Sequence, residues 1–163
     1  MTNPLEDRGI IPYLMGGLGN QMFTMAAGFV TAKVQNCPLW LPDRDVTDNK
    51  HNKHALNYKD TIFKYAGMHT SMQEKPLINY CLASGYRLNT QIQSGFHPWD
   101  PKTISAGSIL HDYYQYYPAL EPFENELRAV YLKGLEETSQ RLLQLFNVII
   151  QHFCTYVVEI TWM

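Results

Sequence analysis

A strand pattern, a run of glycines and a helix pattern follow one another near the start of the chain. The apolar segment 10–15 (IIPYLM) ends at Gly16 and Gly17, as a buried strand entering a tight turn would. Apolar residues then recur at helical spacing over 20–34, with Asn20 at the expected N-cap. The sequence therefore predicts a strand, a glycine loop and a helix with one buried face.

A second strand is expected directly after this helix. The short run 39–41 (LWL) is apolar and is stopped by a proline and Asp43. A strand, a turn, a helix and a strand in this order open a parallel α/β sheet. We expect the loop Gly16–Gln21 to join the first strand to the first helix, which requires Gly19 to lie outside any helix.

The remainder of the chain gives weaker patterns. Proline is favoured in the first turn of a helix, so the clearest downstream helix is expected to begin at Pro122. The full set of expected elements is a surface loop over 43–59, an amphipathic segment over 61–68, irregular structure over 73–97 with a strand at 78–82, a strand over 108–117, a helix from Pro122, a helix over 136–146 and a strand over 148–150.

Composition narrows the classes of function. At 163 residues the chain has room for one ordinary domain. Its 13 basic and 15 acidic side chains give a formal charge of −2, so it lacks the positive charge that binds a nucleic acid backbone. Three scattered cysteines are too few for a disulfide scaffold and show no zinc-ligand spacing. We expect no metal, no cofactor and no nucleic acid partner.

The glycine segment suits an anionic ligand. Glycines between a strand and a helix let backbone N–H groups approach a diphosphate, and the helix N-terminus adds a positive dipole end. A tight packing turn explains the same glycines without any ligand. A dinucleotide-binding fold is a further alternative, because Asp43 ends the second strand, although Met22 stands where a third glycine is expected.

The full string GGLGNQMF, residues 16–23, resembles the N-terminal signature of the α-1,2-fucosyltransferase family. These enzymes transfer fucose from GDP-fucose to the 2-hydroxyl of a galactoside. The aromatic run Tyr113–Tyr117, followed by Phe123 and Glu124, is similar to a second family segment. His111 and Asp112 depart from it, because the family usually has a glycine before the tyrosine. The resemblance covers roughly residues 10–150.

This resemblance implies a Rossmann-like half of a GT-B-like glycosyltransferase and an inverting, metal-independent transfer. The partners would be GDP-fucose and a galactoside acceptor, and no other protein partner can be inferred. The catalytic base is not identified. The implied donor-binding residues are Gly16, Gly17, Gly19, Asn20 and Gln21, and Tyr114 and Gln115 are candidates for the acceptor side.

The family's later arginine motif, HVRRGDY, does not occur in the chain. Back-translating residues 152–163 with permitted codons and reading from the third base gives FLHVRRGDYLD, which contains it. We therefore expect a flexible N-terminus over 1–9, a transferase region over 10–150 and an out-of-frame tail over 151–163. A truncated chain of this kind is expected to be inactive and marginally folded.

The N-terminus has neither a signal nor an anchor pattern, so we expect a soluble, cytoplasmic chain as written, or a Golgi membrane protein if a complete eukaryotic member carries an anchor. A non-catalytic remnant is the third functional hypothesis. His51 and His54 could suggest a metal pair, but their polar setting favours a solvated loop. His111 and Asp112 could suggest an acid–base dyad, but adjacent strand residues point to opposite faces, so we expect a structural role for one of them. We expect the aromatic run Tyr113–Tyr117 to fill a core instead of stacking on sugar, and His97–Pro101 to form an ordinary loop instead of an acceptor site.

Overall fold

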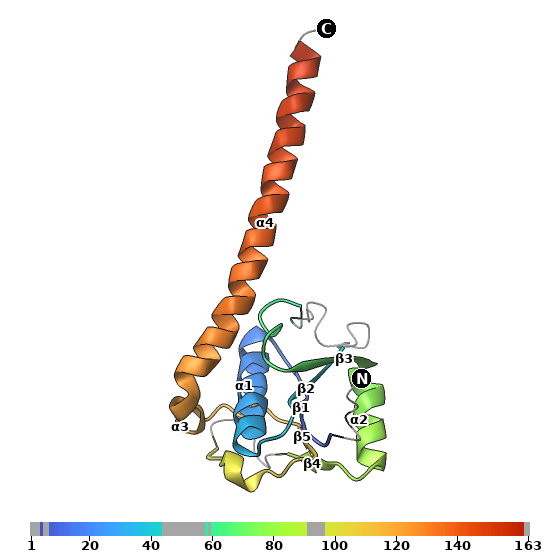
Figure 1. Ribbon diagram of the computed structural model, residues 1–163, viewed down its shortest axis with the longest axis vertical. Helices are drawn as coiled ribbons and strands as arrows, with labels where there is room; N and C mark the ends of the chain where they lie inside the picture. Colours follow the sequence, from blue (N-terminus) through green and yellow to red (C-terminus); the bar gives the residue numbers. More distant parts are fainter. Residues whose placement is uncertain (1–3, 5–6, 44–57, 59, 91–96, 162–163) are drawn as a thin grey trace.

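The computed structural model describes residues 4, 7–43, 58, 60–90 and 97–161, with the side chains of α4 described up to residue 141 and at residue 144 (Figure 1). Helices and strands alternate along most of the chain. The elements are β1 (Ile10–Pro12), α1 (Leu18–Val34), β2 (Trp40–Asp43), β3 (Met68–Gln73), α2 (Glu74–Ala83), β4 (Arg87–Asn89), η2 (Pro101–Thr103), β5 (Ser108–Leu110), α3 (Tyr117–Leu120), η3 (Glu121–Phe123) and α4 (Glu124–Thr161).

Every strand pairing described is parallel. One sheet has the order β1-β5-β4, and β2 pairs with β3 in the other. A parallel bridge between Ile10 and Leu39, with Ile10 N donating to Pro38 O at 2.8 Å, joins the two sheets through β1 and β2. The chain is therefore an α/β protein, as the opening strand–helix–strand pattern predicted.

Helices cover both faces of this sheet. Figure 1 shows α1 on one side of the strands and α2 on the other. Ile10 of β1 belongs to the apolar cluster on the α1 side, whereas its neighbour Ile11 packs with Leu77 and Cys81 of α2. This alternation follows from strand geometry, because successive side chains point to opposite faces. Parallel strands buried on both faces explain why segment 10–15 is continuously apolar.

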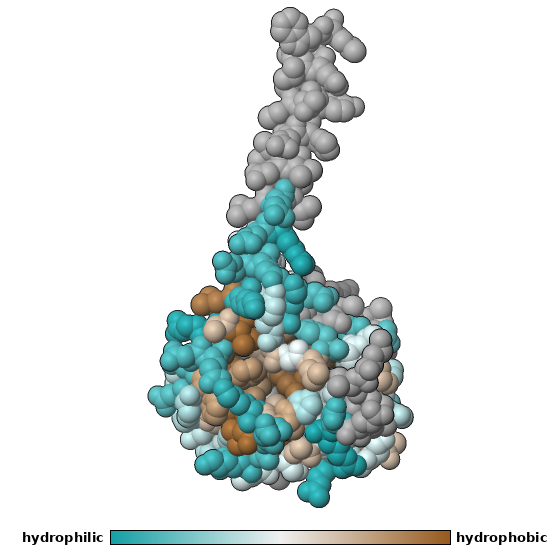
Figure 2. Space-filling view, in the orientation of Figure 1, coloured by the Kyte–Doolittle hydropathy of each residue, from teal (hydrophilic) through white to brown (hydrophobic). Residues whose placement is uncertain are grey.

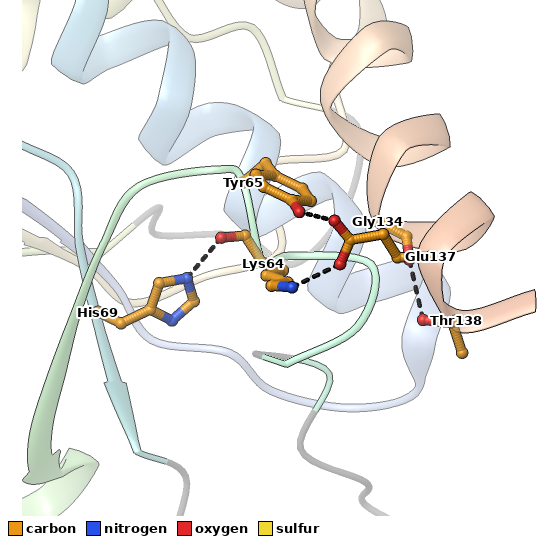
Figure 3. Close-up of polar contacts among 6 residues, drawn as sticks. All are labelled: Lys64, Tyr65, His69, Gly134, Glu137 and Thr138. Carbon is orange, nitrogen blue, oxygen red and sulfur yellow. Dashed lines mark hydrogen bonds and ion pairs between the residues drawn. The ribbon is translucent and has the colours of Figure 1, made fainter. Parts of the chain in front are cut away.

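The first third of α4 is tied to the body, and the rest projects beyond it (Figure 1). Glu137 accepts hydrogen bonds from Lys64 Nζ and Tyr65 Oη, and Figure 3 shows the three side chains converging between α4 and the turns over 60–66. One turn earlier, Gly134 lies so close to Thr61 and Ile62 that no side chain fits between them. The contact of α4 with the body at the turns over 60–66 thus combines close packing at Gly134 with the ion pair between Glu137 and Lys64.

Two expected elements in the middle of the chain are wrong. Residues 74–83, expected to be irregular with a strand at 78–82, form the helix α2. Pro76 is tolerated because it stands third in the helix, where a backbone N–H would have no intrahelical partner. The strand expected over 108–117 is only Ser108–Leu110, and the following aromatic residues form a loop that leads into α3.

The C-terminal elements also differ from expectation. One helix, α4, runs from Glu124 to Thr161 in place of two helices and a strand at 148–150. A short apolar run with β-branched residues fits a strand or a buried helix equally well, so periodicity alone does not decide. Pro122 precedes the helix in a 3₁₀ turn. Within the described residues, no helix has both the length and the apolar character needed to cross a bilayer.

Two buried tyrosines predict a loss of stability at high pH. Burial raises the pKa of both Tyr114 and Tyr131 above the ordinary value of 10, and the Asp112 carboxylate adds to the effect at Tyr114. Because the tyrosines ionise at a lower pH in the unfolded chain than in the folded one, their contribution to stability is fully present below pH 10. This contribution is lost as the pH rises above 10. We expect the free energy of unfolding to fall by about 2 kcal/mol between pH 10 and 11 because of these two groups.

Urea unfolding at pH 8, 10 and 11 measures this loss. The matched variant is Tyr114→Phe combined with Tyr131→Phe, which keeps both rings and removes both hydroxyls. Those hydroxyls donate to Asn89 Oδ1 at 2.7 Å and to Met22 O at 2.7 Å, so the variant starts about 2 kcal/mol less stable at pH 8. An equal decline with pH in both proteins would show that other groups cause it.

Candidate functional site

The glycine loop lies where the direction of strand order reverses. From β1 the chain moves outward through α1 to β2 and β3, and α2 then crosses the opposite face to β4 at the other edge. The carboxyl ends of β1 and β5 are therefore neighbours, and each continues into a loop, 13–17 and 111–116. Ligands of open α/β sheets bind in the crevice at such a point. The candidate site is built from these two loops.

Gly16 makes the turn out of β1. Its φ is +71°, a left-handed conformation that a side chain disfavours, and an added Cβ would lie 2.7 Å from Asn20 Nδ2. Tyr113 of the second loop also lies beside it, with Cε1 3.3 Å from that Cβ position. Glycine is required here by backbone conformation and by close approach.

The expected bounds of the loop are wrong. Gly17, with φ −73° and ψ 174°, is the N-cap, and α1 begins at Leu18, so Gly19 lies inside the first helical turn. Asn20 is therefore not the N-cap, and the loop ends at Gly17 instead of Gln21. No side chain caps this helix, so the preference of asparagine for the N-cap does not apply here. Glycine is itself an acceptable N-cap residue.

Gly17 and Gly19 face open space. A Cβ at either position would meet no atom within 4 Å, so packing does not require glycine at either. The first N–H groups of a helix have no intrahelical partner, and here they belong to Leu18, Gly19 and Asn20. A ligand can therefore approach unpartnered backbone donors at the positive end of the helix without meeting a side chain at Gly17 or Gly19.

Three hydrogen bonds fix the loop and the helix start. Gln21 is buried, and its Nε2 donates to Gly16 O at 2.9 Å, so it positions the turn from within. Asn20 Oδ1 accepts from Gln115 Nε2 at 2.8 Å, which ties the first loop to the second. Glu74 Oε1 accepts the Leu14 N–H at 3.2 Å. The groups that position the loop are thus neutral or anionic.

The two residues expected on the acceptor side differ in exposure. Tyr114 is fully buried in a left-handed conformation with φ +51°, and its hydroxyl donates to both Asn89 O and Asn89 Oδ1. Trp99 packs against its ring edge-on at 5.5 Å. Gln115 is partly exposed and reaches Asn20. The structure brings Gln115 to the glycine loop. Tyr114 belongs to the same second loop, but its side chain is buried in the core.

His111 and Asp112 have different contact partners. The His111 ring stacks on Tyr13 at 4.9 Å, on the α2 side. Asp112 is buried; its carbonyl accepts from Thr24 of α1 at 2.9 Å, and its Oδ1 accepts the Tyr113 N–H. This placement agrees with the expectation that the two residues do not form a dyad. His51 and His54 lie outside the described residues.

Two cavities flank the candidate site. The larger, about 450 Å³, lies between α1, α3 and α4 and has an apolar lining that includes Gly19, Met22 and Phe23. Figure 2 shows hydrophobic side chains gathered on the body below the projecting helix. The smaller cavity, about 300 Å³, lies on the α2 side and includes the Tyr13–His111 pair. Within the described residues, no group of three or more His, Cys, Asp or Glu side chains could hold a metal ion.

Several contacts of the site had no signal in the sequence. Glu74, Thr24 and Asn89 each hold a loop residue in place, although none belongs to a motif. Their partners are 25 to 88 residues away in the chain, so only the folded topology brings them together. The stacking of Tyr13 on His111 arises in the same way from the pairing of β1 with β5.

Comparisons with family models, with curated proteins and with solved structures found no match to this chain.

Proposed function

We propose that this polypeptide is part of a glycosyltransferase that binds a nucleotide-sugar donor at the glycine loop. More narrowly, we propose a Rossmann-like half of a GT-B-like α-1,2-fucosyltransferase, which transfers fucose from GDP-fucose to the 2-hydroxyl of a galactoside. The observation that carries the proposal is the open backbone at Gly17 and Gly19, in the first turn of α1, at the point where strand order reverses. The string GGLGNQMF supports the narrower assignment.

The proposed roles differ among the loop residues. Gly17 and Gly19 leave room for the diphosphate against the first N–H groups of α1. Gly16 and the buried Gln21 hold the turn, and Asn20 links it to Gln115 on the second loop. Gln115 is thus positioned near the donor, consistent with a place on the acceptor side. Tyr114 anchors the second loop to the core through its buried ring, and its role on the acceptor side stays a prediction.

Replacing Gly19 by alanine separates a ligand site from a packing turn. Because a Cβ there meets nothing, the variant should fold, and its unfolding free energy should rise by up to about 1 kcal/mol through helix propensity. The added methyl would occupy the space through which the diphosphate approaches. We expect the Kd for GDP-fucose to rise at least tenfold, measured by titration of the full chain followed by NMR chemical shifts.

The matched control is Lys33→Ala at the opposite end of α1, which should bind GDP-fucose as the unmodified chain does. Equal affinity in Gly19→Ala and the unmodified chain would mean that the glycine serves the fold alone. Failure of the folded, unmodified chain to bind GDP-fucose or GDP would overturn the assignment of the glycine loop as a donor site that suffices for binding.

A dinucleotide-binding domain is the second candidate, and one observation favours it. Asp43 is the last residue of β2, next to the strand that carries the glycine loop, where an acidic residue can bind a ribose hydroxyl. Titration with NAD in parallel with GDP-fucose decides between the two. Tighter binding of NAD, lost in Asp43→Ala, would replace the transferase proposal.

A further inference from the structure

The cavity on the α2 side of the sheet has the chemistry of a sugar-binding site. It measures about 300 Å³, at the lower end of the range for small-ligand pockets. Its polar groups are the Lys75 ammonium, the Asn79 amide and the His111 imidazole, and its remaining walls are aromatic and aliphatic. The lining residues are Tyr13, Lys75, Ile78, Asn79, Leu82, Leu88 and His111.

The walls match the two kinds of surface on a pyranose ring. The stacked rings of Tyr13 and His111, 4.9 Å apart and 16° from parallel, present aromatic surface to the weakly polarised C–H groups of a sugar. Asn79 can donate to one hydroxyl and accept from its neighbour, and Lys75 can donate to another. Hydrogen-bond donors and acceptors beside one aromatic surface suit a sugar, which has both hydroxyl groups and an apolar ring face.

The position of the cavity relative to the glycine loop fits a second substrate. Tyr13 precedes the glycine loop, and His111 begins the loop that Gln115 links to Asn20. Tyr13 and Ile78 pack with the α2-side cluster, whereas α1 contributes to the clusters on the other face. An inverting displacement needs the attacking hydroxyl about 3–3.5 Å from the anomeric carbon, on the side away from the leaving diphosphate. The cavity borders the same two loops that form the candidate donor site, so an acceptor bound in it lies beside that site.

We propose that this cavity binds the pyranose ring of the acceptor glycoside, an assignment that rests on the proposed transferase function. Tyr13 and His111 form the stacking surface, and Lys75 and Asn79 bind hydroxyl groups. The acceptor then lies beside the two loops that carry the proposed donor site at the N-terminus of α1.

Titration of the full chain with methyl β-galactopyranoside, followed by NMR, tests the proposal. Asn79 is exposed on α2, so Asn79→Ala should fold normally and raise the Kd about tenfold through loss of its hydrogen bonds. Leu88 is 49% exposed, and Leu88→Trp should fill the cavity and abolish binding. The matched control is Gln140→Ala, an exposed amide on α4, which should leave the Kd unchanged.

Three results would overturn the assignment: no binding of the galactoside by the unmodified chain, binding unaffected by both Asn79→Ala and Leu88→Trp, or displacement of the galactoside by GDP. The last result would identify the cavity as a nucleotide site. Loss of GDP-fucose binding in Gly19→Ala is measured separately. The donor and acceptor assignments therefore fail independently.

Discussion

Substituting alanine for Gly134 is expected to lower the unfolding free energy by about 2–3 kcal/mol, as overpacking of a tight contact does. The added Cβ would lie 2.4 Å from Thr61 O and 2.9 Å from both Cα and O of Ile62. These are backbone atoms, which cannot rotate away as the end of a side chain can. The helix must therefore shift away from the turns over 60–66, or the turns must move.

Moving α4 would disturb contacts on both sides of Gly134. Glu137 would separate from Lys64 and Tyr65, which meet it on the same face (Figure 3). Tyr131, whose hydroxyl donates to Met22 O, would lose its contact with α1. Thermal unfolding followed by circular dichroism measures the effect, and we expect the midpoint to fall by about 5–10 °C.

The Gly19→Ala variant serves as the control for this substitution. It makes the same chemical change within a helix, but its Cβ meets nothing within 4 Å. Its midpoint should stay the same or rise, because alanine favours a helix more than glycine does. If Gly134→Ala unfolds at the same temperature as Gly19→Ala, then α4 does not pack over Thr61 and Ile62 as described.

The sequence predicted those parts of the fold whose cause is local. The apolar run at 10–15, the helical spacing over 20–34 and the strand at 39–41 correspond to β1, α1 and β2. Each of these elements is buried, so its pattern is strong. The missed helix α2 is mostly exposed apart from Glu74, Leu77 and Cys81, and three buried positions in ten residues leave little periodicity to detect.

The position of the turn that carries the candidate site was predictable from the sequence, but its detailed geometry was not. The glycines marked the turn after β1, because only a left-handed residue fits at Gly16. The N-cap was predicted three residues too late, at Asn20 instead of Gly17. The Asn20 side chain accepts a hydrogen bond from Gln115 and does not cap the helix. That pairing spans 95 positions of sequence and depends on β5 lying beside β1. No local pattern contains this information.

The charges of the side chains around the glycine loop indicate whether this loop alone could stabilise a departing diphosphate. A diphosphate leaving group gains negative charge as its bond to the sugar breaks, and preorganised donors must stabilise that charge. The positioning groups are the amides of Gln21 and Gln115 and the carboxylate of Glu74, which is 7% exposed. None of these three side chains carries a positive charge. If the loop binds a donor diphosphate as proposed, cationic groups are needed opposite it, and arginines suit this role because they bind phosphate in a bidentate manner.

We therefore expect fucosyl transfer to require the arginine motif that appears when residues 152–163 are read in the alternative frame. A gene corrected to continue as FLHVRRGDYLD should yield a protein that transfers fucose from GDP-fucose to a β-galactoside, whereas the chain as printed should be at least a hundredfold slower. The measurement is transfer of labelled fucose to lactose by the two proteins at equal concentration. A corrected protein in which both motif arginines are replaced by lysine is the matched control, because it keeps the charge and loses the bidentate geometry.

Transfer by the printed chain at a rate comparable to the corrected protein would overturn the need for this motif. A folded corrected protein that binds no GDP-fucose and transfers nothing would overturn the assignment to fucosyl transfer, and sequencing the nucleotides around codon 151 shows directly which frame the gene uses.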